Sequence, residues 1–298
     1  MQEEVLKIVA QALESITLVY DSVEGNDGGS CKDDLLSYGI GRAQTGFIVD
    51  GRYVVTALHG LRSARPCIVV GNEVIEARRV YRDVRWDIAV LDLGSYRTRG
   101  GLRVASRLPF LGEIVLIVGM NRGQLAPYVQ LSMVSSTGLT IRIESRLVEG
   151  AFQLCNAVPK GLSGAPVINV RGEVVGMIVG IDYEMGHSFA VPSLTILSSL
   201  RYVYKGLNPS ERPLFGIKVL TFENSLLILN VFNGSAKECG LKPGDRIVEC
   251  FDGEARRRLK SLYDLWQCLD NAFIKGKTRV HLKVLRNGVT EVKECRIR

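Results

Sequence analysis

From residue 15 to about residue 195 the chain is a succession of short apolar runs separated by turn residues. The runs are rich in Val, Ile, Leu and Tyr, and Gly, Asp or Asn interrupts nearly every gap. Because almost no helical stretch lies between the runs, the pattern predicts an all-β barrel or sandwich rather than alternating strands and helices. The expected strands are 15–20, 45–49, 52–58, 67–70, 87–93, 113–119, 139–143, 165–170 and 173–181.

Helical patterns flank this region. Apolar residues at spacing four predict a short amphipathic helix over 1–14, and 195–206 is expected to form a helix that closes the first domain. The polar, Pro-bounded segment 208–213 is interpreted as a linker. Beyond it, one helix among several strands predicts a small α+β module, with strands near 215–220, 226–232, 246–250, 278–286 and 289–296 and a helix over 261–271. The expected domains are therefore 1–207 and 212–298.

The positive charge is concentrated in the second domain. Of 298 residues, 46% are hydrophobic and 23% charged, which is ordinary for a globular protein. Residues 1–211 carry no net charge, whereas 212–298 hold 17 basic and 10 acidic residues, the whole excess of +7. A solvated basic face, including the run 256–260 as a loop entering the helix, is one interpretation, and an anionic partner is the other. Nucleic acid is not the expected partner, because no aromatic residues interleave the basic run.

The cysteines predict no disulfide framework. Seven of them are scattered without CxxC or His-rich spacing, at 31, 67, 155, 239, 250, 268 and 295. This favours reduced thiols, and neither a metal site nor a cofactor is expected. No window is apolar enough to span a membrane, and the first segment lacks a basic signal region, so the expected location is cytoplasmic.

Three short segments carry a His, an Asp and a Ser in that order. They are TALHG with His59, DIAVL with Asp87 and GLSGAP with Ser163. A serine hydroxyl needs an adjacent base to become a nucleophile, imidazole is suited to that task, and a carboxylate fixes its tautomer. Asp83 and Asp92 are the alternative acids.

Glycines beside Ser163 permit a tight turn, whose Gly161 and Ser163 N–H groups would form an oxyanion hole. The order His, Asp, Ser is that of the chymotrypsin-like double β-barrel, not of α/β-hydrolases or subtilisins.

These motifs resemble those of HtrA/DegP-type, trypsin-like serine proteases with one C-terminal PDZ domain. TALHG and DIAVL resemble the histidine and aspartate motifs, GLSGAPVINVRGEVVGMIVGI resembles the serine loop with its following strands, and FAVPS (189–193) resembles the end of the protease domain. The second domain resembles a PDZ module at FGI (215–217), GSA (234–236) and LKPGDRI (241–247).

The resemblance implies further sites and partners. A specificity pocket is expected at Ala157, Val158, Met177 and Gly180, which bring no carboxylate and so favour small or medium apolar side chains. The predicted PDZ groove would bind peptide C-termini through Phe215, Gly216 and Ile217, with Leu262 and Leu269 on the helix beside it. The implied function is ATP-independent endoproteolysis of unfolded or damaged polypeptides, in a trimer-based homo-oligomer.

A second hypothesis follows from departures at the serine loop. Leu162 stands where the family usually has Asn, Ala165 where it has a second Gly, and Ala43-Gln44-Thr45 replaces Gly-Ser before the first barrel strand. A protease-like chaperone or peptide-binding scaffold with weak or no catalysis is the alternative.

Overall fold

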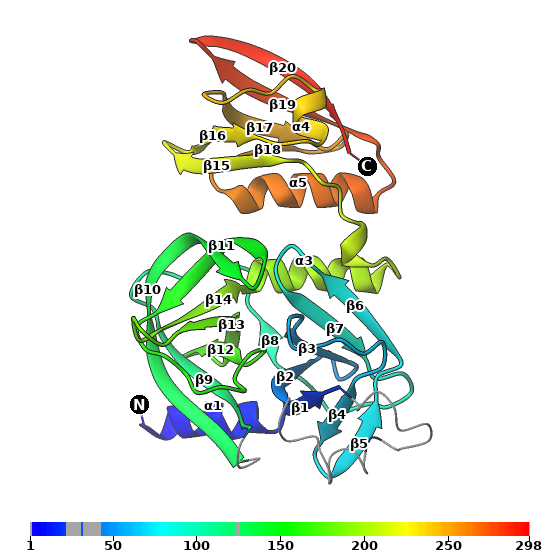
Figure 1. Ribbon diagram of the computed structural model, residues 1–298, viewed down its shortest axis with the longest axis vertical. Helices are drawn as coiled ribbons and strands as arrows, with labels where there is room; N and C mark the ends of the chain where they lie inside the picture. Colours follow the sequence, from blue (N-terminus) through cyan, green and yellow to red (C-terminus); the bar gives the residue numbers. More distant parts are fainter. Residues whose placement is uncertain (1, 22–30, 32–42, 123–125, 298) are drawn as a thin grey trace. The chain divides into compact units, whose positions relative to one another are not determined.

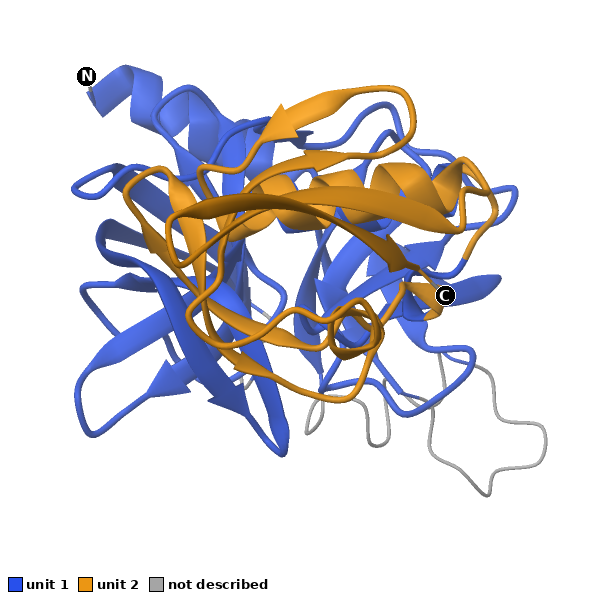
Figure 2. Ribbon diagram, turned by 90° about the horizontal axis from the view of Figure 1, so that it is seen from above, with its two compact units in different colours: residues 1–204, 208–210 blue, residues 205–207, 211–298 orange. Residues whose placement is uncertain are grey.

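The computed structural model describes residues 2–21, 31, 43–122 and 126–297. The chain divides into two compact units, one of Met1–Tyr204 with Asn208–Ser210 and one of Lys205–Leu207 with Glu211–Arg298 (Figure 2). Both are built mainly from β-strands, so the predicted fold class is confirmed.

The first sheet of unit 1 has seven strands in the order β5-β4-β1-β2-β3-β7-β6 (Figure 1). Every residue of β1, β2, β3 and β7 is buried. Burial on both faces explains why these strands are continuous apolar runs rather than alternating patterns. The bounds are β1 Ile16–Tyr20, β2 Gln44–Val49, β3 Tyr53–Ala57, β4 Cys67–Val70, β5 Glu73–Glu76, β6 Arg79–Asp83 and β7 Ile88–Asp92.

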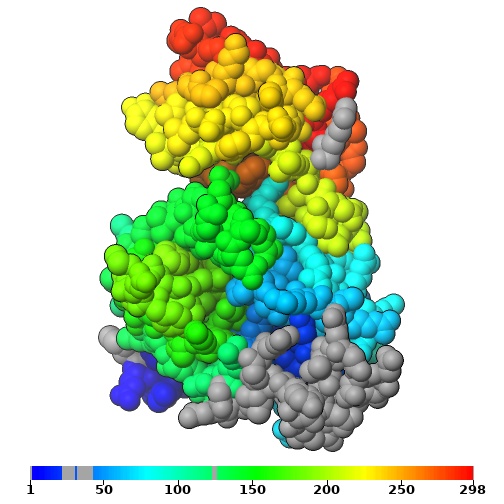
Figure 3. Space-filling model, viewed as in Figure 1, coloured from blue at the N-terminus to red at the C-terminus, as the bar shows by residue number. Residues whose placement is uncertain are grey.

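The second sheet has the order β12-β9-β10-β11-β14-β13-β8, and an extra pairing of β12 with β13 closes it into a barrel. Its interior is filled by apolar side chains that include Phe152, Leu162 and Ile178. The two sheets lie side by side in Figures 1 and 3, the first in blue and cyan, the second in green. The bounds are β8 Arg103–Val104, β9 Ile114–Asn121, β10 Ala126–Ile143, β11 Arg146–Leu154, β12 Pro166–Asn169, β13 Glu173–Asp182 and β14 His187–Pro192.

Two helices flank these sheets, as predicted. α1 spans Gln2–Leu13 and α3 spans Ser193–Tyr204, which buries most of its residues against the sheets. Among the described residues, no helix combines the length and apolar character needed to cross a membrane.

Unit 2 is a sheet in the order β15-β16-β17-β19-β20, with β18 paired to β17. Its longest helix, α5, begins at a capping box in which Ser261 and Asp264 bond each other's backbone N–H groups. The basic run was expected to be a loop, but Arg256–Arg258 pair with β17 as a short strand. The bounds are η2 Pro209–Glu211, β15 Ile217–Phe222, β16 Ser225–Val231, α4 Ser235–Glu238, β17 Arg246–Phe251, β18 Arg256–Arg258, α5 Leu262–Ile274, β19 Arg279–Arg286 and β20 Val289–Arg296.

The expectation of reduced thiols is wrong. Six of the seven cysteines form disulfides, Cys31–Cys67 in unit 1 and Cys239–Cys295 and Cys250–Cys268 in unit 2. Cys155 is free and exposed. The partners lie 18 to 56 residues apart in sequence, so tertiary pairing brings them together without any local spacing motif.

Candidate active site

Pairing of two strands in the first sheet brings His59 and Asp87 together. β3 ends two residues before His59, β7 begins directly after Asp87, and Ala57 lies opposite Ile88 in the antiparallel pair. The Leu58 N–H donates to the Asp87 carbonyl at 2.9 Å, which extends the register to the two functional residues.

The Asp87 carboxylate is buried and contacts the imidazole directly. Asp87 is 1% exposed, and its Oδ2 lies 2.5 Å from His59 Nδ1. Asp87 also has a φ of +56°, a conformation that residues other than Gly seldom adopt and that is found preferentially at functional sites. This geometry fixes the ring so that Nε2 points away from the acid.

Ser163 completes the line of contacts. It lies in the loop before β12, and its Oγ is 3.1 Å from His59 Nε2. The structure therefore brings all three predicted residues into the arrangement of a nucleophile, a base and an orienting acid.

The two alternative acids are engaged elsewhere. Ser199 Oγ donates to Asp83 at 2.7 Å, and Arg52 pairs with Asp92 at 2.9 Å. Burial, the largest single effect, would raise the pKa of Asp92, but the hydrogen bonds from Arg52 and the Gly94 N–H, together with the charges of Arg52 and Arg78, outweigh it and hold the pKa below its usual range. Both carboxylates support the fold.

The serine loop packs directly on β2 through Thr45. The Thr45 N–H donates to the carbonyls of Gly161 at 3.1 Å and Ser163 at 3.0 Å, and its Oγ1 donates to Gly161 as well. A Cβ at Gly164, whose φ is +83°, would lie 2.1 Å from the Thr45 carbonyl. Only glycine fits there, which accounts for the residue after the serine.

Two backbone N–H groups of the serine loop are available to donate hydrogen bonds to a substrate. Those of Leu162, Gly164 and Ala165 donate to protein carbonyls. Within the described residues, the N–H groups of Gly161 and Ser163 donate no hydrogen bond, as an oxyanion hole requires. The Leu162 side chain is fully buried in the second barrel. The leucine that stands in place of the family's usual Asn therefore adds apolar packing to this core.

Sequence reasoning missed two side chains that support the site. Gln44 is 4% exposed and donates to Thr56 Oγ1 at 3.0 Å and the Ala57 carbonyl at 2.7 Å, just before His59. The altered Ala43-Gln44-Thr45 segment was a signal for this contact. No motif or spacing in the sequence pointed to Arg146, whose Nη2 lies 3.5 Å from Asp87 Oδ1.

The residues of the predicted specificity pocket differ in their exposure to solvent. Val158 and Met177 are closed to solvent, at 1% and 0% exposure, whereas Ala157 and Gly180 are partly exposed. The pocket thus stays a prediction that rests on Ala157 and Gly180.

The predicted carboxylate loop lies before β15 in unit 2. Gly216 has a φ of +79°, and the carbonyls of Phe215 and Gly216 accept hydrogen bonds from Ala236 and Phe232. The N–H groups of Phe215 and Gly216 donate none within the described residues, while Ile217 begins the strand. On α5, Leu262 is half-buried and Leu269 is closed to solvent.

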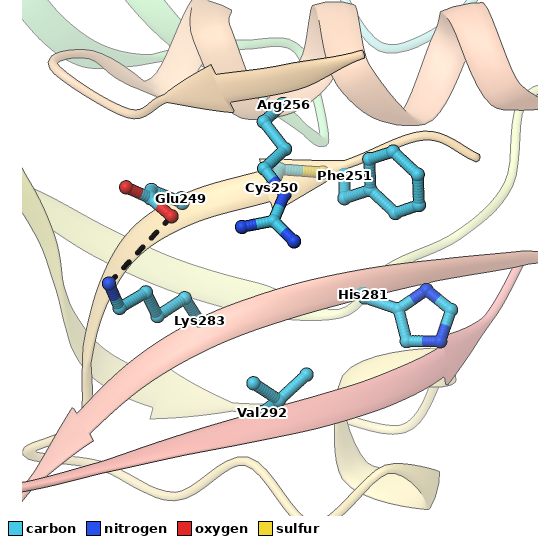
Figure 4. A pocket seen from close by; sticks show the side chains of 7 residues that line it. All are labelled: Glu249, Cys250, Phe251, Arg256, His281, Lys283 and Val292. Carbon is cyan, nitrogen blue, oxygen red and sulfur yellow. Dashed lines mark ion pairs between the residues drawn. The ribbon is translucent and has the colours of Figure 1, made fainter. Parts of the chain in front are cut away.

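A hollow of about 260 Å³ opens on the sheet of unit 2, and none of these residues lines it (Figure 4). Lys283 lies 3.9 Å from Glu249, and His281 lies 3.3 Å from Glu294. The lining thus sets one carboxylate, Glu249, against the cationic side chains of Lys283 and Arg256. It is lined by Glu249, Cys250, Phe251, Arg256, His281, Lys283 and Val292.

Comparison with known proteins agrees with this geometry. Residues 44–177, which include His59, Asp87 and Ser163, match the family described as a trypsin-like peptidase domain. The chain is similar to a serine protease Do-like HtrA of Lactobacillus helveticus, 27% identical over 284 residues that cover 83% of this chain and 67% of that protein. It is 30% identical over 278 residues to a probable periplasmic serine endoprotease DegP-like of Chlamydia trachomatis, with 83% of this chain and 52% of the relative covered. These comparisons support a trypsin-like serine protease that is similar to HtrA-type proteins over most of the chain.

Two solved structures share the fold over nearly the whole chain. The HtrA-type protease AlgW with decapeptide aligns with a TM-score of 0.63 at 17% identity, covering 98% of this chain and 97% of that one. The serine endoprotease from Yersinia pestis aligns with a TM-score of 0.60 at 20% identity, covering 98% and 96%. The curated relatives are longer, since the chain spans roughly half to two thirds of their length.

Proposed function

We propose that this HtrA-type protein is an endopeptidase in which Ser163 attacks the scissile carbonyl. His59 accepts the Ser163 proton and later returns it to the leaving amine, while Asp87 orients the imidazole and stabilises its protonated form. The Gly161 and Ser163 N–H groups receive the oxyanion. The observation that carries the proposal is the unbroken line of contacts, 2.5 Å from Asp87 to His59 and 3.1 Å from His59 to Ser163.

Unfolded or damaged polypeptides are the proposed substrates, cleaved without ATP or metal. Ala157 and Gly180 bring no charge to the predicted specificity pocket, which favours small or medium apolar residues before the scissile bond.

Unit 2 is proposed to be a PDZ domain that binds peptide C-termini. The N–H groups of Phe215 and Gly216, which donate no hydrogen bond to the described part of the chain, support capture of a terminal carboxylate, with the peptide added to the edge of β15. A solved relative carries a decapeptide, which agrees with peptide binding in this family. Trimer-based self-assembly is also proposed, from the family resemblance.

An oxidising compartment is the proposed location, in place of the cytoplasm. Disulfides persist where thiols are not continuously reduced, and several relatives are named as periplasmic.

The test compares the wild-type chain with Ser163→Ala in casein digestion and in labelling by a fluorophosphonate probe. We expect the substitution to abolish both, because the nucleophile is lost, a cost on the order of 10⁶ in turnover in well-studied triads. The variant should still bind a peptide with a free terminal carboxylate more tightly than its amide. Wild-type-like digestion by Ser163→Ala would refute the assignment of the nucleophile.

A chaperone or scaffold with weak catalysis is the second candidate, favoured by Leu162 and Ala165 in the serine loop. It predicts that the wild-type chain binds unfolded casein but leaves it intact and reacts with the probe no faster than Ser163→Ala.

A further inference from the structure

A hairpin of the second barrel reaches the buried acid of the first sheet. β10 and β11 pair as far as Ile143 opposite Arg146, with a tight turn in which Glu144 has a φ of +51°. From this turn, Arg146 Nη2 lies 3.5 Å from Asp87 Oδ1 and 3.6 Å from Glu144 Oε2. The guanidinium is therefore shared between a buried and an exposed carboxylate.

The Asp87 oxygen that faces Arg146 lacks other support. Oδ2 is occupied by His59 Nδ1, whereas Oδ1 is buried and accepts no hydrogen bond within the described residues. A buried carboxylate is costly unless charge or hydrogen bonds compensate it. Arg146, with a side chain 25% exposed, supplies the positive charge on the side of Asp87 opposite the imidazole.

We propose that Arg146 is a positioning residue that acts through Asp87, an inference that rests on the proposed triad. Held by His59 at one oxygen and by Arg146 at the other, the carboxylate keeps the rotamer that accepts the hydrogen bond from the Nδ1–H of the imidazole. The hairpin tip thereby couples the second barrel to the acid of the first sheet, in addition to the contact made by Ser163.

The test measures kcat/KM for an internally quenched peptide, and the rate of fluorophosphonate labelling, in full-length Arg146→Gln. Loss of the acid costs about 10⁴ in a studied triad, so loss of its support alone should cost less, roughly 10- to 100-fold. Arg146→Lys should retain part of the activity, because it keeps the charge without the planar donor pair. Arg142→Gln is the matched control, since Arg142 is an exposed residue of the same hairpin, and it should match the wild type.

A double-mutant cycle separates positioning from general damage to the fold. In an Asp87→Asn background, Arg146→Gln should cause no further loss in the labelling rate, because the group through which it acts is already altered. By NMR, the wild type is expected to show a strongly downfield proton resonance for the His59 Nδ1–H. This resonance should weaken or shift in Arg146→Gln and persist in Arg142→Gln.

The outcomes that overturn this inference differ from those that overturn the triad. Equal activity of Arg146→Gln and Arg142→Gln, or an equal loss from Arg146→Gln with Asp87 and with Asn at position 87, contradicts positioning by Arg146. If Arg146→Gln is unstable, the same comparisons are made with Arg146→Lys. Absence of labelling in the wild type, or activity in Ser163→Ala, contradicts the proposed function itself.

Discussion

Glu173 is a single residue whose ionisation is strongly tied to the fold. It begins β13, and hydrogen bonds from the Asn169 amide and the Arg171 guanidinium, together with Arg103, lower its pKa to about 2. The Asn169 side-chain oxygen also accepts hydrogen bonds from the backbone N–H groups of Arg171 and Glu173. These bonds close the turn between β12 and β13. The carboxylate thus fastens one corner of the second barrel in its ionised form.

Glu173→Gln should therefore lower the free energy of unfolding at neutral pH by about 1–2 kcal/mol. This figure allows for solvent screening of the exposed Arg103 and Arg171. Because the pKa is lower in the folded state, the stabilisation is complete above the ordinary glutamate pKa near 4.5 and is lost as pH falls toward 2. Denaturant unfolding of both proteins should show a gap that closes over this range. Glu184→Gln, on an exposed turn, is the control, and a pH-independent gap would contradict the mechanism.

The three residues that form the proposed triad could be predicted because each lies in a recognisable local motif. Their supporting residues could not. The contact of Thr45 with Gly161 spans 116 positions in sequence, and the approach of Arg146 to Asp87 depends on where a hairpin tip lies after two sheets have formed. Contacts between distant elements leave no periodic or local pattern to detect.

At the level of elements, two disulfides fasten the sheet of unit 2. Cys250 of β17 is joined to Cys268 of α5, and Cys239, directly after α4, is joined to Cys295 of β20. The helix beside the proposed peptide groove is therefore covalently fixed to the central strand. Such a crosslink limits the freedom of the unfolded chain more than it strengthens native contacts.

Replacing Cys250 and Cys268 together by Ser should lower the stability of unit 2 by about 3 kcal/mol, the value expected for a loop of 18 residues. Thermal unfolding with and without reductant measures the effect, which reductant should reproduce in the wild type. Alkylation of the unfolded, unreduced chain should modify one thiol, Cys155. Modification of seven would show that the bridges are absent.

Strands with continuous apolar runs were predictable, whereas exposed or amphipathic strands were not. β5 and β6, the two edge strands of the first sheet, carry charged residues, and β18 is entirely basic. β10 extends over Ala126–Ile143, but only its last five residues were predicted, because exposed side chains alternate with half-buried ones along its first half. Pairing with neighbours, rather than intrinsic apolarity, makes these segments strands.

At the level of the whole molecule, each unit has its own core and its own sheets. The start of unit 2 is fixed internally by a buried ion pair, in which Arg212 Nη1 lies 2.5 Å from Asp270 Oδ2. A cut after residue 210 leaves this pair intact on one side and the proposed triad intact on the other.

A fragment of residues 1–210 should consequently fold and react with a fluorophosphonate probe, while 211–298 should unfold cooperatively by itself. Solubility, circular dichroism and probe labelling of the two fragments measure this. Digestion of a short peptide should be retained by the first fragment, whereas digestion of casein should change without the proposed PDZ domain. An insoluble 1–210 fragment would show that the units depend on a common core.

His59 and Ser163 lie 104 positions apart in sequence, and this separation also matters during biosynthesis. The strands that hold His59 and Asp87 leave the ribosome well before the loop that holds Ser163, and that loop is fixed only when β12 pairs with β9 and β13. On the proposed mechanism, a nascent chain therefore has its base but not its positioned nucleophile until the second barrel closes. An incomplete chain is consequently expected to cleave no peptide bonds while it is still being made.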